Sequence, residues 1–164
     1  VNARSCACSA AALGAREVAQ KEAGATELAW QELSAARARV ETQTIGQYLP
    51  QDLNFDLNET VNFTKGCYTG QEIVARLHYR GTPKRRLHRA LSTVTAAPGE
   101  FLVNDSNQSV GSVVNQFSRD EITHLLVELI PKAAHGPVAL RGSGAAITSV
   151  VRCHEDRDQS TEPR

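Results

Sequence analysis

The stretch VGSVVNQFSRDEITHLLVELI, residues 110–130, predicts two β-strands joined by a tight turn. Val110–Phe117 and Ile122–Ile130 are rich in β-branched and other apolar residues, which favour extended backbone. The piece between them, Ser118-Arg119-Asp120, is polar and carries residues typical of turns. We therefore expect two consecutive strands separated by a turn.

Similar segments lie on both sides of this hairpin, from about Lys84 onward. Short polar pieces rich in Gly, Pro, Asn and Ser separate them. The further strand candidates are Leu87–Val94, Glu100–Val103, Val138–Leu140 and Ala145–Val151. Six short strands with frequent turns are typical of a small antiparallel barrel or sandwich.

The part of the chain before these strands has a helical and then an irregular pattern. The first forty residues are rich in Ala, and apolar residues recur every three to four positions between Glu27 and Glu41, which predicts helix. The period is lost over residues 42–64, which we expect to be a connecting stretch with short extended pieces and no long helix. A second, short helix is expected after Thr69, because Thr69-Gly-Gln-Glu72 has capping-box spacing, and it should end at Gly81 and Pro83.

Composition bounds the classes of protein that remain. The 164 residues carry 18 basic and 18 acidic side chains, which argues against a wholly disordered chain and a general nucleic-acid-coating protein. No apolar run is long enough for a membrane helix. Met is absent even at position 1, so we expect a processed chain or a fragment. With four Cys, a reducing compartment is favoured over a disulfide scaffold.

Positive charge is concentrated between Lys65 and Arg89. Seven basic residues opposed only by Glu72 give this window a charge of +6. A solvated loop would account for it, as would a surface for an anionic ligand, a nucleic acid or an acidic partner.

The segment KGCYTGQE, residues 65–72, holds the best candidate for chemistry. Cys67 precedes a predicted helix start, where backbone N–H groups favour negative charge, and Lys65 adds a cation. Gly66 and Gly70 permit a tight backbone. These features favour a reactive thiolate, although a buried structural Cys is the simpler alternative. The Cys and His spacings predict no permanent metal site, but Cys67 could hold a cluster transiently between chains.

Trp30 is the sole Trp of the chain. Its position on the apolar face of the first predicted helix favours a core role. The alternative is a flat ring that stacks on a heterocyclic ligand.

The segment 65–72, with Ile73-Val74-Ala75-Arg76 after it, resembles the signature of the YgfZ family. These are folate-binding proteins, similar to the glycine-cleavage T-protein, that are associated with iron–sulfur cluster assembly or repair. The stretch QYLPQ, residues 47–51, and the basic entry into a β-rich region resemble the family as well. The resemblance covers roughly residues 30–151.

The resemblance implies an α+β fold in three parts. Residues 1–83 would be the end of a T-protein-like folate-binding region, residues 84–153 the C-terminal β-barrel, and residues 154–164 a disordered tail. Family members are longer, so we expect the N-terminal half of the family fold to be missing from this chain.

The resemblance also implies which residues matter. Cys67 would be the functional thiol with Lys65 beside it, and Trp30 would contact a tetrahydrofolate derivative. The motif positions are Gly66, Tyr68, Gly70, Gln71, Glu72 and Arg76.

The leading hypothesis is a maintenance factor, more a binder than an enzyme, that supports [4Fe–4S] clusters and through them tRNA methylthiolation. Its partners would be cluster assembly or carrier proteins and client enzymes, with an indirect effect on tRNA. The basic patch of Arg76, Arg80, Lys84, Arg85 and Arg86 would dock an acidic partner or an anionic ligand tail. We expect a bacterial cytoplasmic protein, with the mitochondrial matrix as the alternative.

Two further functions stay open. The first is a folate-dependent aminomethyl transferase, in which Asp52 or Asp56 would supply the acid or base. The second is a basic RNA-binding module, in which Tyr68 and Tyr79 would stack on bases.

Overall fold

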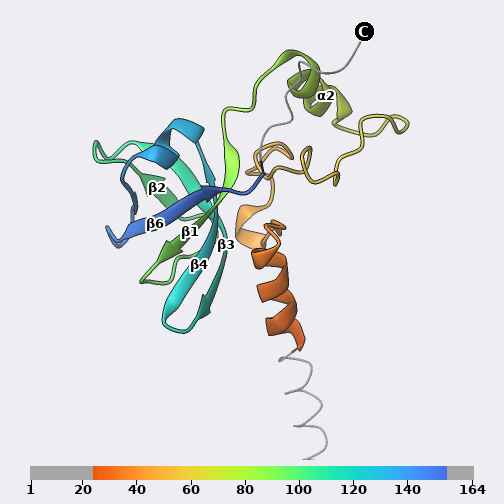
Figure 1. The fold of residues 1–164 in the computed structure, drawn as a ribbon. Helices are drawn as coiled ribbons and strands as arrows, with labels where there is room; N and C mark the ends of the chain where they lie inside the picture. The colour runs from red at the N-terminus through yellow and green to blue at the C-terminus, as the bar shows by residue number, and fades with distance from the viewer. Residues whose placement is uncertain (1–23, 155–164) are drawn as a thin grey trace, which may run out of the picture.

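The computed structural model describes residues 24–154. In this range two α-helices and two short 3-10 helices accompany six strands, which confirms the α+β class (Figure 1). The elements are a first helix over residues 24–34, η1 (Thr42–Thr44), α2 (Gln71–Arg80), β1 (Arg86–Ser92), β2 (Phe101–Val103), β3 (Ser109–Arg119), β4 (Ile122–Leu129), η2 (Pro131–His135), β5 (Val138–Leu140) and β6 (Ala146–Arg152). The expectations for residues 1–23, with Cys6 and Cys8, and for the tail from residue 155 lie outside the described residues.

The six strands close into an antiparallel barrel in the order β1-β4-β3-β2-β5-β6, with β6 returning to β1. Of the two architectures that the sequence predicts, a barrel and a sandwich, the structure is the barrel. Every strand begins and ends within two residues of the predicted bounds. The described helices are all too short and polar to cross a membrane.

The β3–β4 hairpin forms the longest ladder of the barrel. It turns through two residues, Asp120 and Glu121, whose φ angles are +52° and +63°. Such a turn matches the right-handed twist of the flanking strands. Near the other end, a Cβ on Gly111 would lie 1.9 Å from the Glu128 carbonyl oxygen, so only glycine lets the two strands approach this closely.

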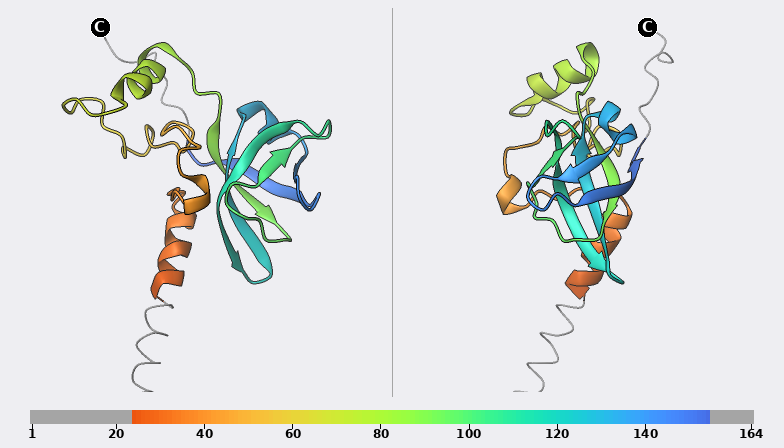
Figure 2. Two further views of the ribbon diagram at one scale, coloured as in Figure 1. Left: turned by 180° about the vertical axis from the view of Figure 1, so that it is seen from behind. Right: turned by 90° about the vertical axis from the view of Figure 1, so that its left-hand side faces the viewer.

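Apolar side chains fill both the inside and one outer face of the barrel. On β4, Leu125, Val127 and Leu129 belong to the interior cluster, whereas Leu126 packs outside. The outer cluster unites Leu126 with Leu33 of the first helix and with Leu53, among others. The segment before the barrel thus covers the outer face of β1, β3 and β4 (Figure 2), and this explains why β4 is apolar nearly throughout.

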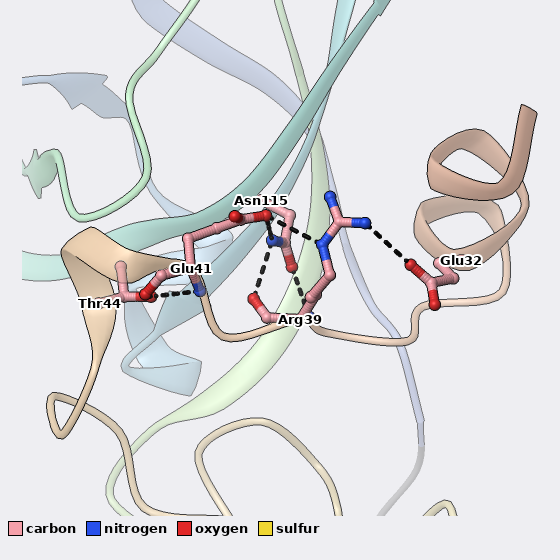
Figure 3. A network of polar contacts seen from close by, with 5 residues as sticks. All are labelled: Glu32, Arg39, Glu41, Thr44 and Asn115. Carbon is pink, nitrogen blue, oxygen red and sulfur yellow. Dashed lines mark hydrogen bonds and ion pairs between the residues drawn. The ribbon is translucent and has the colours of Figure 1, made fainter. Parts of the chain in front are cut away.

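The first helix ends earlier than the sequence predicts. It stops at residue 34, Ala36 has a φ of +54°, and the backbone from residue 37 to 41 is non-helical. The amide of Asn115 explains the change, because it accepts a hydrogen bond from Arg39 N–H at 2.8 Å and donates one to the Arg39 carbonyl at 2.9 Å (Figure 3). A distant strand residue therefore overrides the local helical period.

The helix α2 lies where it was predicted, but the expected capping box is wrong. The N-cap is Gly70, with a φ of +87°, so Thr69 stands one position too early to cap the helix. Glu72 instead pairs with Arg76 at 2.8 Å. The side chain of Gln71 accepts the Tyr68 N–H at 3.3 Å, which ties the loop to the start of the helix but does not cap it. The helix ends at Gly81, as expected.

Candidate functional site

The loop that precedes α2 presents Cys67 to solvent. Cys67 is a free, exposed thiol. The ammonium of Lys65 lies 5.0 Å from the centre of the Tyr68 ring, a cation–π contact. The structure thus brings Lys65, Cys67 and Tyr68 to one exposed loop, and activation of the thiol by Lys65 stays a prediction.

A local turn and one ring stack order this loop. The side-chain oxygen of Asn62 accepts hydrogen bonds from the backbone N–H groups of Thr64 and Lys65 at 2.8 and 3.2 Å. The Phe63 ring stacks on His78 of α2 at 3.8 Å between ring centroids. The loop is therefore attached to the far half of the helix that follows it, which limits where the thiol can lie.

The stretch at residues 47–51 joins α2 to the barrel. The Tyr48 hydroxyl lies 3.0 Å from the Ser112 hydroxyl and donates to the Val113 carbonyl at 3.2 Å. The buried Gln51 side chain donates to the Val74 carbonyl of α2 at 2.7 Å. No local sequence pattern signals these contacts, and the stretch stands out in the sequence only by its resemblance to the family.

A buried ion pair fixes the same connection from the barrel side. Arg86 on β1 contacts Asp56 at 2.7 Å, and both side chains are less than a tenth exposed. The same guanidinium donates to the Gln51 carbonyl at 2.9 Å. The side chain of Asn54 bonds both the N–H and the carbonyl of Leu87. No local pattern reveals these contacts, because the partners lie thirty or more positions apart.

The expected basic docking surface is smaller than predicted. Arg86 is buried in its ion pair, and Arg85 is tied to the buried Glu128 at 2.9 Å. The basic side chains that stay exposed around α2 are Arg76, Arg80 and Lys84. The prediction was therefore wrong for Arg86, because the carboxylate of Asp56 and the Gln51 carbonyl hold its guanidinium inside.

Trp30 packs on the outside of the barrel. Its ring lies 5.5 Å from Phe117 and 4.9 Å from His124, and the Arg119 guanidinium lies 5.2 Å from its centre. Figures 1 and 2 place the helix that carries Trp30 and α2 at opposite ends of the segment beside the barrel. The structure therefore does not bring Trp30 and Cys67 together.

The described cysteines differ in their chemistry. Burial raises the pKa of the half-buried Cys153 thiol to about 11, which opposes a thiolate there. Cys67 is exposed and free to meet a partner. Over residues 24–154 no group of three or more His, Cys, Asp or Glu is placed to hold a metal ion. A ligand set that included Cys67 would need groups from another molecule or from the rest of the chain.

Comparisons with known proteins give a consistent pattern. No family model matches the chain. A "tRNA-modifying protein YgfZ" of Yersinia enterocolitica is 36% identical over 80 residues, which is 46% of this chain and 24% of that protein. The chain is a distant, partial homologue of the YgfZ proteins.

Two further YgfZ proteins extend the similarity. The protein of Klebsiella pneumoniae is 35% identical over 96 residues, and that of Aliivibrio fischeri is 31% identical over 101 residues. These regions cover 56% and 58% of this chain but only 29% and 32% of the relatives. The chain thus spans about a quarter to a third of the length of the curated YgfZ proteins it matches, in their C-terminal portion.

Proposed function

We propose that this chain acts as a YgfZ-like factor in tRNA modification, with Cys67 as its functional thiol. The observation that carries the proposal is the exposed, anchored Cys67 loop in a chain homologous to proteins named for tRNA modification. An exposed cysteine is poorly suited to a core role, so the structural alternative for Cys67 loses its main support.

The chemistry proposed for Cys67 is that of an iron ligand. Iron–sulfur clusters are held by cysteine thiolates, and an exposed thiolate on a fixed loop can complete the ligand set of a cluster carried by another protein. The partners would be cluster assembly or carrier proteins and [4Fe–4S] client enzymes, including one that methylthiolates tRNA. The effect on tRNA is then indirect, and its setting is the bacterial cytoplasm.

Folate binding at Trp30 stays a prediction, and no contact of the described residues adds support to it. The Trp30 ring already contacts Phe117, His124 and Arg119 of the β3–β4 hairpin. Trp30 also lines neither the groove beside α2 nor the hollow at the end of the barrel near η2. No step of the proposed function is therefore assigned to folate.

The aminomethyl transferase alternative also finds little support in its candidate residues. Asp56 is engaged by the Arg86 guanidinium. Asp52 accepts a hydrogen bond from the Leu49 N–H at 3.0 Å, and burial raises the pKa of its carboxyl. Both carboxylates hold the chain together, and neither lies on the Cys67 loop.

The proposal is tested by complementation in bacterial cells that lack their own YgfZ. Wild-type chain, Cys67→Ala and Cys153→Ala are expressed to equal abundance, as measured by immunoblot. The readout is the methylthio-modification level of tRNA. We expect rescue by the wild type and by Cys153→Ala, and a level equal to that of empty-vector cells for Cys67→Ala.

Two results would overturn the proposal. Full rescue by Cys67→Ala would show that the thiol is dispensable. Failure of the wild-type chain to raise the modification level at normal abundance would show that this chain does not carry the proposed function.

A further inference from the structure

A largely apolar groove of about 400 Å³ lies along α2, between this helix and Leu49. Ile73, Leu77 and Leu49 supply its apolar lining, and its charged lining residues are Arg76, Arg80 and Glu72. Ile73 is 63% exposed and Leu49 is 41% exposed. Large aliphatic side chains exposed together on a helix face are a common mark of a protein interaction site.

The shape of the groove depends on Gly81 at the end of α2. A Cβ at this position would lie 2.9 Å from Cδ1 of Leu77. Glycine therefore lets the Leu77 side chain lie along the end of the helix, where it forms part of the groove lining. Gly81 therefore helps to shape the apolar lining of the groove.

The net charge along the groove is positive, because two arginines, Arg76 and Arg80, outnumber the one lining carboxylate, Glu72. Among the described residues, Arg80 and the nearby exposed Lys84 form no salt bridge. Arg76 pairs with Glu72 at 2.8 Å, but both side chains are more than two-thirds exposed. Such an exposed pair within one helix is weak, so the Arg76 guanidinium can turn to a carboxylate that binds beside it.

The lining chemistry discriminates between classes of partner. A small anion would leave Ile73, Leu77 and Leu49 in contact with water. Single-stranded nucleic acid is held through rings that stack on its bases, and no aromatic side chain lines this groove. An amphipathic peptide with apolar residues on one face and carboxylates beside them satisfies both the aliphatic lining and the arginines.

We propose that this groove binds an acidic amphipathic segment of a partner protein. The helix α2 begins four residues after Cys67 and its Val74 carbonyl is tied to Gln51. A segment seated in the groove would therefore bring its protein next to the thiol. The identity of the partner rests on the proposed function, whereas the groove and its charge are observed independently of that function.

A display library of random peptides is the probe that tests the proposal. Peptides are selected on the purified wild-type chain, sequenced, and the enriched ones are measured by fluorescence anisotropy. We expect enriched peptides to combine Leu, Ile or Phe with Asp or Glu. Their affinity should fall about tenfold or more for Ile73→Asp and for Arg80→Glu, since each removes one of the two complementary features.

Matched variants keep the result interpretable. Val40→Asp makes the same change at an apolar side chain that is 49% exposed elsewhere, and peptide affinity should be unchanged. Cys67→Ala should also leave peptide affinity unchanged, so a failure of the thiol hypothesis and a failure of the docking hypothesis give different results. Circular dichroism confirms that each variant is folded.

Three outcomes would overturn the proposal. The first is that no peptide is enriched, or that the enriched peptides bind Ile73→Asp and Arg80→Glu as well as the wild type. The second is a wild-type dimer in gel filtration that Ile73→Asp converts to a monomer, because the groove would then be covered by a second copy. The third is salt-sensitive tRNA binding that both groove variants abolish.

Discussion

Glu128 on β4 is a buried carboxylate that is only partly satisfied. Its side chain is 2% exposed, and one oxygen accepts a hydrogen bond from Arg85 at 2.9 Å. The other oxygen is buried and has no hydrogen-bond partner among the described residues. Burial raises the pKa of Glu128 above its ordinary value, the negative charge of Asp52 adds to the rise, and Arg85 opposes it.

This raised pKa predicts a pH-dependent stability. The folded chain binds the Glu128 proton more tightly than the unfolded chain, so the contribution is fully present below a pH of about 4.5 and is lost as the pH rises through the folded pKa. The free energy of unfolding of Glu128→Gln, relative to the wild type, should therefore rise with pH above that value. Between the pKa of Glu128 in the unfolded chain and its pKa in the folded chain, this difference in free energy should rise by up to about 1.4 kcal/mol per pH unit.

Urea denaturation at pH values between 4 and 8 measures this difference in free energy. A spacing of about half a pH unit is enough to define a slope of that size. Glu121→Gln, in the exposed β3–β4 turn, is the control for the loss of one surface carboxylate. If both variants change the pH dependence of the free energy of unfolding equally, the burial of Glu128 is not the cause of that change.

Asn115 on β3 predicts a second effect at the scale of one residue. Its amide bonds the N–H and the carbonyl of Arg39, and its nitrogen lies 3.3 Å from a Glu41 carboxylate oxygen (Figure 3). In Asn115→Asp the donor is lost, and a buried negative charge faces both the Arg39 carbonyl and Glu41. We expect the free energy of unfolding to fall by about 3 kcal/mol at neutral pH.

Gln116→Glu makes the same change of amide to acid at the next, exposed position of β3. It should change the free energy of unfolding by less than about 0.5 kcal/mol, as surface substitutions usually do. Equal losses for the two variants in urea denaturation would mean that the bonds to Arg39 carry no special weight.

At the scale of elements, the attachment of α2 to the barrel depends on the ion pair of Arg86 and Asp56. Asp56→Ala would remove the carboxylate that the buried guanidinium of Arg86 contacts at 2.7 Å. We expect a loss of about 3 kcal/mol or more in the free energy of unfolding, measured in urea. Removal of the exposed partner of Arg76, in Glu72→Ala, should cost only about 0.3–0.5 kcal/mol. Similar losses in the two variants would contradict a special role for the buried pair.

The elements that sequence predicted well are those specified by local signals. The turn residues between the strands predicted the bounds of all six strands to within two residues, and Gly81 predicted the end of α2. The early end of the first helix was not predictable, because the Asn115 amide that binds Arg39 lies 76 positions away. The resemblance located the Cys67 loop, but the burial of Arg86 depends on Asp56, thirty positions upstream.

At the scale of the whole molecule, contacts cross the boundary that the sequence predicts at residue 83. Leu33 and Leu53, which precede it, pack in one cluster with Leu87, Val114 and Leu126 of the barrel. The three barrel residues are fully buried, and this burial requires the earlier segment to remain in place. We therefore expect residues on both sides of the boundary to unfold in one cooperative transition.

Two probes and one pair of variants test this cooperativity. Trp30 fluorescence reports on the contact between the first helix and β3–β4, whereas the amide NMR signals of β1 and β4 report on the barrel strands. Leu33→Ala should lower the free energy of unfolding by about 3 kcal/mol with both probes, and Leu28→Ala, at a side chain that is 54% exposed on the same helix, should change it little. If Leu33→Ala shifts the fluorescence transition alone, the segment before residue 84 unfolds as a separate unit. The outer face of the barrel would then be stable without its cover, and the boundary predicted from the sequence would also be a thermodynamic one.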